Sequence, residues 1–298
     1  MRFVKPPLIR RRQGTELRLG LRTLYILPTR FGLLWLATAG LLYLVGLQMR
    51  SNGSLLLSFL LLGLMLLSMH LTHDNLQGLS LKCGDPEPSF AGQTVLYPLL
   101  IHSRDPKQRL ELQFRGADPL VLQRLSAGET AVDLPWPASE RGWQIPGRLH
   151  IETTAPLGLF VCWSSWEPSR QQLIYPARRS GPVVVEHQDL QSDGLEEWQD
   201  VKPHRPGERL ALVDWTSLAK GRRLQSKQFA DPSEESLMLS PAAGLNREQA
   251  LEHLAHCIWQ MHQRGAIYGL RLAGQTLHPC DGVSHRDACL ELLATARR

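Results

Sequence analysis

Hydrophobic residues are concentrated in two uninterrupted runs near the start of the chain. The runs are FGLLWLATAGLLYLVGLQM (31–49) and SLLLSFLLLGLMLLSMHL (54–71), and neither contains an Asp, Glu, Lys or Arg residue. A helix of about 20 residues covers roughly 30 Å, which is the thickness of the hydrocarbon core of a bilayer. Only residues 50–53 separate the runs, so the pattern predicts a two-helix transmembrane hairpin over 31–71, in which each helix satisfies its own backbone. The alternatives are two buried helices of a globular core and a cleaved signal peptide, which the long preceding segment disfavours.

The pattern of hydrophobic residues changes after the hairpin. Short apolar stretches occur at 95–102, 110–114, 148–153 and 160–166, and residues such as Pro, Gly, Asp and Ser separate them. Stretches of this length bounded by turn-forming residues are typical of strands. Several of them within about a hundred residues predict an antiparallel β-sandwich domain over 76–178.

The last part of the chain alternates between strand and helix patterns. A short apolar run at 236–240 is followed by Asn246, a favoured helix N-cap residue, and then by an apolar stripe with helical spacing. The stripe consists of Leu251, Leu254, Ile258 and Met261. A second strand is expected over 266–274 and a final helix from Ser284 through Leu293. This order predicts a small parallel α/β domain over 181–298.

Charge is distributed unevenly along the chain. The net charge is +5, but residues 1–30 hold eight Lys or Arg side chains against Glu16 alone, so that the remainder is slightly acidic. A short basic arm beside an apolar run is typical of a segment held on an anionic membrane surface, whereas a nucleic-acid-binding domain spreads its charge over a folded face. The arginines expected at the membrane surface are Arg10, Arg11, Arg12, Arg18, Arg22 and Arg30. The connection between the runs offers only Arg50, so the positive-inside rule predicts that both ends of the chain are cytoplasmic.

Cysteine and histidine positions give no metal or disulfide pattern. The five cysteines are scattered without a CxxC spacing, which suits a reducing compartment. His253, His256 and His262 fall on one expected helix, but His262 lies about 180° around the helix from His253. We therefore expect no metal ion and no cofactor.

Several segments together resemble the bacterial domain-of-unknown-function family 58. They are LPTRFGLL (27–34), MHLTHDNLQGL (69–79), IETTAPLGLF (151–160), IYP (174–176) and VKPHRPGERLALVDWTSLAKGRRLQSKQFADP (201–232). The resemblance implies two membrane helices, a β-sandwich and a core related to von Willebrand factor A domains. It also implies a bacterial inner-membrane location and partnership with a MoxR-type AAA+ ATPase.

The family motif within 201–232 is altered in this chain. His204 stands where the family usually has Tyr, Glu208 replaces an Asp, and the Ser-Ala-Arg step becomes Ser217-Leu218-Ala219-Lys220, while Asp214-Trp215 is kept. If the motif has an active role in the family, part of it is altered here. The Asp-x-Ser-x-Ser run of a von Willebrand-type metal site is also missing, because 240–244 reads SPAAG.

The segment 200–228 is strongly basic, with seven Lys or Arg residues against three acidic ones. One hypothesis is that it docks an acidic partner surface or a phosphate-bearing ligand; the alternative is an internal network of ion pairs. The residues assigned to partner binding are Arg205, Pro206, Gly207, Glu208, Asp214, Trp215, Lys220, Arg222, Arg223 and Lys227.

Three classes of function follow from these patterns. The chain contains no GxSxG elbow, P-loop, HExxH or dinucleotide-binding motif. We favour a membrane-anchored, non-enzymatic interaction or scaffold module that works with an AAA+ ATPase or an envelope-related partner. The alternatives are a membrane-bound enzyme with a site near Glu208, Asp214 and Lys227, and a structural subunit of a membrane complex.

Overall fold

A computed structural model describes residues 12–189, 197–203, 225–230, 235–272 and 274–296. These residues fall into two compact units. The first runs to Ala177 and also takes in the residues from Ala294, and the second runs from Arg178 to Leu293.

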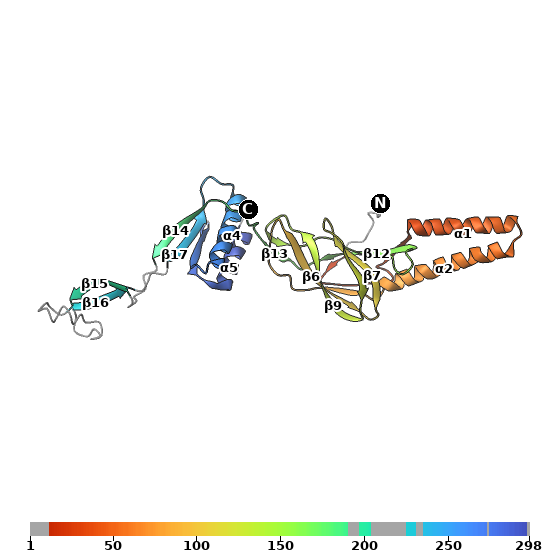
Figure 1. Cartoon of the computed structure of the whole chain (residues 1–298), viewed down its shortest axis with the longest axis horizontal. Coiled ribbons are helices and arrows are strands. Elements are labelled where there is room, and N and C mark those ends of the chain that lie inside the picture. The colour runs from red at the N-terminus through yellow and green to blue at the C-terminus, as the bar shows by residue number, and fades with distance from the viewer. Residues whose placement is uncertain (1–11, 190–196, 204–224, 231–234, 273, 297–298) are drawn as a thin grey trace. The chain divides into compact units, whose positions relative to one another are not determined.

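Two long helices form the hairpin of the first unit (Figure 1). They are α1, Arg30–Gln48, and α2, Asn52–Leu76, and both are long and apolar enough to cross a membrane. Thr29 caps α1 by accepting a hydrogen bond from the amide of Gly32, and Ser51 caps α2. The two predicted apolar helices are confirmed, although α2 continues five residues beyond the predicted limit of 71. Its last polar turn stays helical because the sandwich holds it, as described below.

The two helices bind each other through polar contacts and turn their apolar side chains outward. The Ser58 hydroxyl donates to the carbonyl of Ala39 at 2.8 Å, and the Trp35 indole donates to the carbonyl of Leu61 at 3.0 Å. Leu34 and Leu56 are 64% and 73% exposed, and most of the large apolar side chains that the described residues expose lie on these helices. An outer surface of this kind is suited to lipid rather than to water.

Two main sheets and a smaller one make up the rest of the first unit. One sheet has the order β1 (Gln13–Gly14), β12 (Phe160–Pro168), β11 (Leu149–Thr153), β7 (Lys107–Phe114) and β8 (Leu120–Leu125). The strand β3 (Tyr25–Pro28) also pairs with β12. The other has the order β2 (Glu16–Arg18), β4 (Ser80–Cys83), β6 (Thr94–Ser103) and β9 (Gly128–Pro137). The smaller sheet has the order β10, β13, β5: Gly142–Gln144, Gln172–Tyr175 and Ser89–Phe90. Most neighbours are antiparallel, but β1 with β12 and β13 with β5 are parallel.

One hydrophobic core joins the two main sheets. In β6 every second residue is buried, and the apolar ones among them are Val95, Tyr97, Leu99 and Ile101. This alternation is the strand period that exposes one face and buries the other. The buried residues of β6 share a cluster with Leu110, Leu112 and Phe114 of β7, and the rings of Tyr97 and Phe114 meet edge to face at 5.8 Å. The strands predicted at 95–102, 110–114, 148–153 and 160–166 are confirmed as parts of β6, β7, β11 and β12.

The described part of the basic arm contributes to both main sheets. β2 pairs with β4, and β3 pairs with β12. The charge pattern predicts that 1–30 is an arm at the membrane surface, whereas the structure forms three short strands of the folded unit between Gln13 and Pro28. Glu16-Leu17-Arg18-Leu19 alternates polar and apolar residues, and Leu17 and Leu19 are buried in the core. That alternation was the available strand signal.

The second unit is a mixed α/β layer. Its sheet has the order β14, β17, β18, β19: Val183–Asp189, Glu235–Pro241, Tyr268–Leu272 and Gln275–Cys280. The helices α4, Arg247–Gln263, and α5, Gly282–Thr295, lie beside each other on one face of it (Figure 1). A separate two-stranded ribbon consists of β15, Glu197–Pro203, and β16, Gln225–Ala230.

The predicted strand and helix order of the second unit is confirmed, but the sheet is not wholly parallel. Asn246 caps α4, and Leu251, Leu254 and Ile258 are buried as the stripe predicted. β17 and β18, which α4 connects, are parallel, whereas β14 and β19 run antiparallel to their neighbours. The connection from β18 to β19 is too short for a crossover, and only an antiparallel hairpin fits it. The sequence interpretation included neither β14 nor β19.

Two of the five cysteines test this packing. Cys162 and Cys289 are fully buried, and burial raises the pKa of each thiol to about 12, whereas Cys280 is exposed. Because the thiolate is the reactive form, a thiol with so high a pKa stays protonated and unreactive at pH 7 and still at pH 9. We expect a maleimide to label Cys280 in the native detergent-solubilised protein and to label Cys162 and Cys289 only after denaturation, as read by peptide mass spectrometry. Native labelling of Cys162 at the rate of Cys280 would contradict the described core.

Candidate functional site

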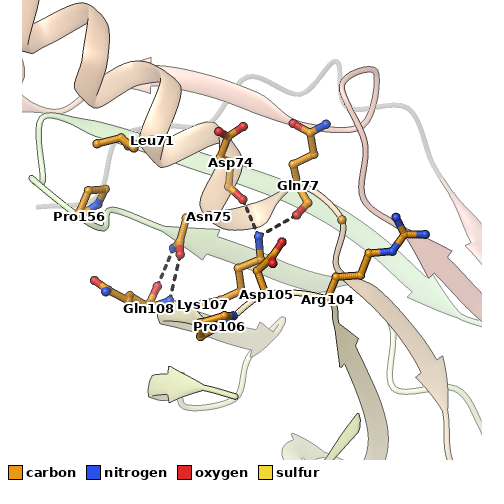
Figure 2. A pocket seen from close by; sticks show the side chains of 11 residues that line it. Leu71, Asp74, Asn75, Gln77, Arg104, Asp105, Pro106, Lys107, Gln108 and Pro156 are labelled. Carbon is orange, nitrogen blue, oxygen red and sulfur yellow. Dashed lines mark hydrogen bonds between the residues drawn. The ribbon is translucent and has the colours of Figure 1, made fainter. Parts of the chain in front are cut away.

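The largest concentration of polar groups on the hairpin lies where α2 enters the sandwich. A cavity of about 550 Å³ opens there, between the last turn of α2 and the start of β7. Figure 2 shows Asp74, Asn75 and Gln77 of the helix end facing Lys107 and Gln108 of the strand. The site therefore forms a joint between the apolar hairpin and the sheets of the first unit.

Lys107 occupies the centre of this joint. Its Nζ donates to the carbonyl of Asp74 at 2.7 Å and to the carbonyl of Gln77 at 3.0 Å (Figure 2). The last carbonyls of a helix have no partner within the helix, and a cation there also opposes the negative end of the helix dipole. Lys107 is only 8% exposed, so its ammonium group contacts this helix end rather than solvent.

Asn75 ties the same helix end to the start of β7. Its amide nitrogen donates to the carbonyl of Gln108 at 2.6 Å and to the hydroxyl of Thr153 at 2.8 Å. Its amide oxygen accepts the backbone N–H of Gln108 at 2.9 Å. The side chain thus imitates the backbone of a neighbouring strand. Leu76, the last residue of α2, is fully buried in the sandwich core.

The loop between β11 and β12 forms the second half of the joint. The hydroxyl of Thr29 donates to the carbonyl of Gly158, and its backbone N–H donates to the carbonyl of Leu159. A Cβ atom at Gly32 would overlap the carbonyl of Leu159, so only glycine allows this approach. Leu159 packs with Phe160 and Met65, and it thereby touches both helices of the hairpin.

A second cavity, of about 600 Å³, lies next to the first, and Gly78 and Arg104 line both. Arg104 is exposed, and its guanidinium has no ion-pair partner among the described residues. Arg18 lines the second cavity and pairs with Glu16 at 2.8 Å. This hydrogen bond lowers the pKa of the Glu16 carboxyl. The second cavity therefore carries basic groups of the N-terminal strands as well as of the sandwich.

The chemistry of the joint is that of a structural contact. Asp74 lies 3.4 Å from His70 and 3.7 Å from His73, and these pairs are ionic only when the imidazoles are protonated. The side chains of Asn75 and Lys107 are already engaged with backbone groups. The part of the chain that the structure describes contains no cluster of three His, Cys, Asp or Glu residues suited to a metal ion.

The residues predicted for partner binding are largely outside the described residues. This applies to Arg205, Pro206, Gly207, Glu208, Asp214, Trp215, Lys220, Arg222 and Arg223, and to the altered motif positions 204 and 217–220. Lys227 falls in β16, whose backbone pairs with β15 at Val201. The structure therefore leaves the basic segment of 200–228 as a prediction.

Four of the six predicted membrane-surface arginines are described. Arg10 and Arg11 lie outside the described residues. Arg12 donates to the carbonyl of Arg22, and Arg18 pairs with Glu16. Arg22 and Arg30 are exposed, and Arg30 is the first residue of α1. Of the described arginines, Arg18 thus lies in β2 and Arg30 in α1, whereas Arg12 precedes β1 and Arg22 lies in the turn before β3.

Sequence reasoning missed Lys107, Asn75 and Thr29 as joint residues. Their partners are 30 or more positions away along the chain, and no local pattern reports such a pairing. The available signal was Asn75 within an otherwise regular helix end, because short polar side chains there favour backbone hydrogen bonds.

No family model, curated protein or solved structure matches the chain.

Removing the charge of Lys107 tests the cap on α2. In Lys107→Met, two carbonyls at the end of α2 lose a charge-assisted hydrogen bond, and we expect the free energy of unfolding in mild detergent to fall by about 2 kcal/mol. Lys82→Met removes an exposed lysine of the same unit and is the matched control, with an expected change within about 0.5 kcal/mol. Equal effects of the two substitutions would show that Lys107 does not hold the helix end.

A methyl group at Gly32 tests the contact between α1 and the loop. Gly32→Ala should destabilise the protein by about 1–3 kcal/mol, because the added Cβ must displace the backbone of Leu159. Gly40→Ala lies on the same helix with nothing within 4 Å of the added Cβ, and it should not destabilise. The comparison is made by denaturant titration of both variants in one detergent. A Gly32→Ala variant as stable as Gly40→Ala would contradict the close approach.

Proposed function

We propose that this protein is a membrane-anchored scaffold that holds its second unit and the basic segment 200–228 for a protein partner. The single observation that carries the proposal is the joint between α2 and the sandwich. Lys107 and Asn75 fix the helix end, and Leu76 is buried in the sandwich core. An anchor built in this way keeps the orientation of the first unit constant relative to the bilayer, which is the property that a scaffold requires.

The pairing of strands across the hairpin supports a placement of both hairpin ends on one side of the membrane. β2 precedes α1 in the chain and β4 follows α2, and the two strands are neighbours in one sheet. The basic residues before α1 favour the cytoplasmic side. We therefore propose a double-spanning protein of the bacterial inner membrane with both termini in the cytoplasm.

The partner is proposed from the family resemblance and from charge. The resemblance to the domain-of-unknown-function family 58 favours a MoxR-type AAA+ ATPase, and it favours a von Willebrand factor A-like relationship for the second unit. The mixed sheet with helices on one face is compatible with that relationship only in the order β17, α4, β18. The basic segment favours an acidic docking surface on the partner.

Charge reversal in the basic segment tests this proposal. We expect Arg222→Glu with Arg223→Glu to abolish recovery of a stoichiometric ATPase when the full-length protein is cross-linked in its native membrane and purified in mild detergent. The physical reason is that two attractive contacts become repulsive. Quantitative mass spectrometry of the purified material measures the outcome.

The control reverses two arginines that are exposed in the described part of the chain. Arg115→Glu with Arg247→Glu changes the net charge by the same amount at residues outside 200–228. Partner recovery should be unchanged in this variant. The scaffold proposal fails if no stoichiometric partner appears with the unmodified protein, and the docking segment is wrong if both pairs of reversals act alike.

A further inference from the structure

A third cavity of the first unit carries positive charges that no ion pair among the described residues neutralises. Its volume is about 330 Å³, and strands β7 and β8 line it together with the loop 154–158. Arg109 and Arg124 both face it, and none of its described lining residues is acidic. Neither guanidinium has an ion-pair partner among the described residues.

The two strands gather their polar side chains here because both change burial phase at the same point. In β7, Lys107 and Leu110 are buried while Gln108 and Arg109 between them are exposed, and in β8 both Gln123 and Arg124 are exposed. A regular strand would turn neighbouring side chains to opposite faces. Gln108 stands opposite Arg124 in the ladder, so the four outward side chains form one compact group.

Arg109 supplies the backbone irregularity at this point. Its φ of 45° lies in the left-handed region, which non-glycine residues adopt rarely and at a cost. The left-handed residue separates the inward Lys107, which caps α2, from the inward Leu110 of the core. Arg109 is exposed and has no ion-pair partner in the described chain. The strained backbone places its side chain at the cavity, beside Arg124.

The cavity lies at the level where the apolar runs of the hairpin end. Gly158, one of its lining residues, accepts a hydrogen bond from Thr29, two positions before the first apolar run. Pro156, another lining residue, also lines the first cavity with Leu71, the last residue of the second apolar run. A bilayer that surrounds the apolar runs therefore places its headgroups beside this cavity.

The loop adds an apolar contact to the basic ones. Leu157 lines the cavity and is 49% exposed at the tip of the loop 154–158. Thr154 lines the cavity as well, and its hydroxyl has no hydrogen-bond partner among the described residues. Two guanidinium groups, a hydroxyl and an apolar side chain match a phosphodiester headgroup with the start of its acyl chains.

We propose that Arg109, Arg124 and the loop 154–158 form a binding site for the headgroup of an anionic phospholipid. Arg109 and Arg124 hold the phosphate through charge-assisted hydrogen bonds, and Leu157 enters the boundary between headgroups and acyl chains. The proposal needs α1 and α2 to cross a bilayer and is independent of any protein partner. Loss of lipid binding would therefore leave the scaffold role unaffected, and the reverse also holds.

The test measures lipid binding to the full-length protein. Delipidated protein in mild detergent is titrated with phosphatidylglycerol or with phosphatidylcholine, and native mass spectrometry counts the bound lipids. We expect preferential binding of phosphatidylglycerol, and a loss of about fivefold in affinity for each arginine, or about 25-fold, in Arg109→Gln with Arg124→Gln. Arg115→Gln with Arg247→Gln removes the same charge at exposed positions elsewhere and should leave the affinity unchanged.

Two further measurements separate this site from a folding effect and from a free-phosphate site. Glycine accepts the left-handed backbone of residue 109, so Arg109→Gly should fold at least as well as the parent and yet lose about fivefold in lipid affinity. Glycerol phosphate should fail to compete with phosphatidylglycerol at equal concentration. The proposal is overturned by unchanged phosphatidylglycerol binding in the Gln pair, by equal losses in the control pair, or by effective competition from glycerol phosphate.

Discussion

The carbonyl groups at the end of α2 need hydrogen-bond partners, and the supply of those partners by Lys107 determines how the first unit is built. A helix that left a bilayer into water would have its last carbonyls solvated. Here Leu76 is already within the core, so the polar groups just before it must be satisfied by protein. Lys107 does this from the start of β7, and the side chain of Asn75 in turn hydrogen-bonds the backbone of Gln108. Gly78, with a φ of 82°, then turns the chain into β4.

This constraint leaves no linker between the hairpin and the sandwich. Only Gln77, Gly78 and Leu79 separate α2 from β4, and Gly78 and Leu79 both hydrogen-bond to Leu19. On the other helix, the contact of Gly32 with Leu159 fixes the start of α1 in the same way. Both helices of the hairpin are thus secured at the same end, and the loop 154–160 lies against both of them.

The elements that the sequence predicted correctly are those whose signal is local. In the two apolar runs, in β6 and in the apolar stripe of α4, the spacing of the apolar residues alone indicates the secondary structure and the buried face. The joint is different, because Lys107 and Asn75 are ordinary residues whose roles come from partners about 30 positions away. The strands β1 to β3 fall between these cases. Residues Glu16 to Leu19 alternate between polar and apolar, which indicates a strand, but the high positive charge of the region favours a prediction of a membrane-surface arm. The outward turn of Arg109 depends on one backbone angle, which no residue pattern reports.

The pairing of β3 with β12 has a consequence for the order of events during synthesis. β3 ends at Pro28, while β12 begins at Phe160, so more than a hundred residues, including the whole hairpin, are made before β3 can find its partner. β2 can pair earlier, because its partner β4 follows directly after α2. The first strands are therefore still unpaired when the hairpin leaves the ribosome. The closing of the sheet at β12 is a late, long-range step, which follows the synthesis of the hairpin.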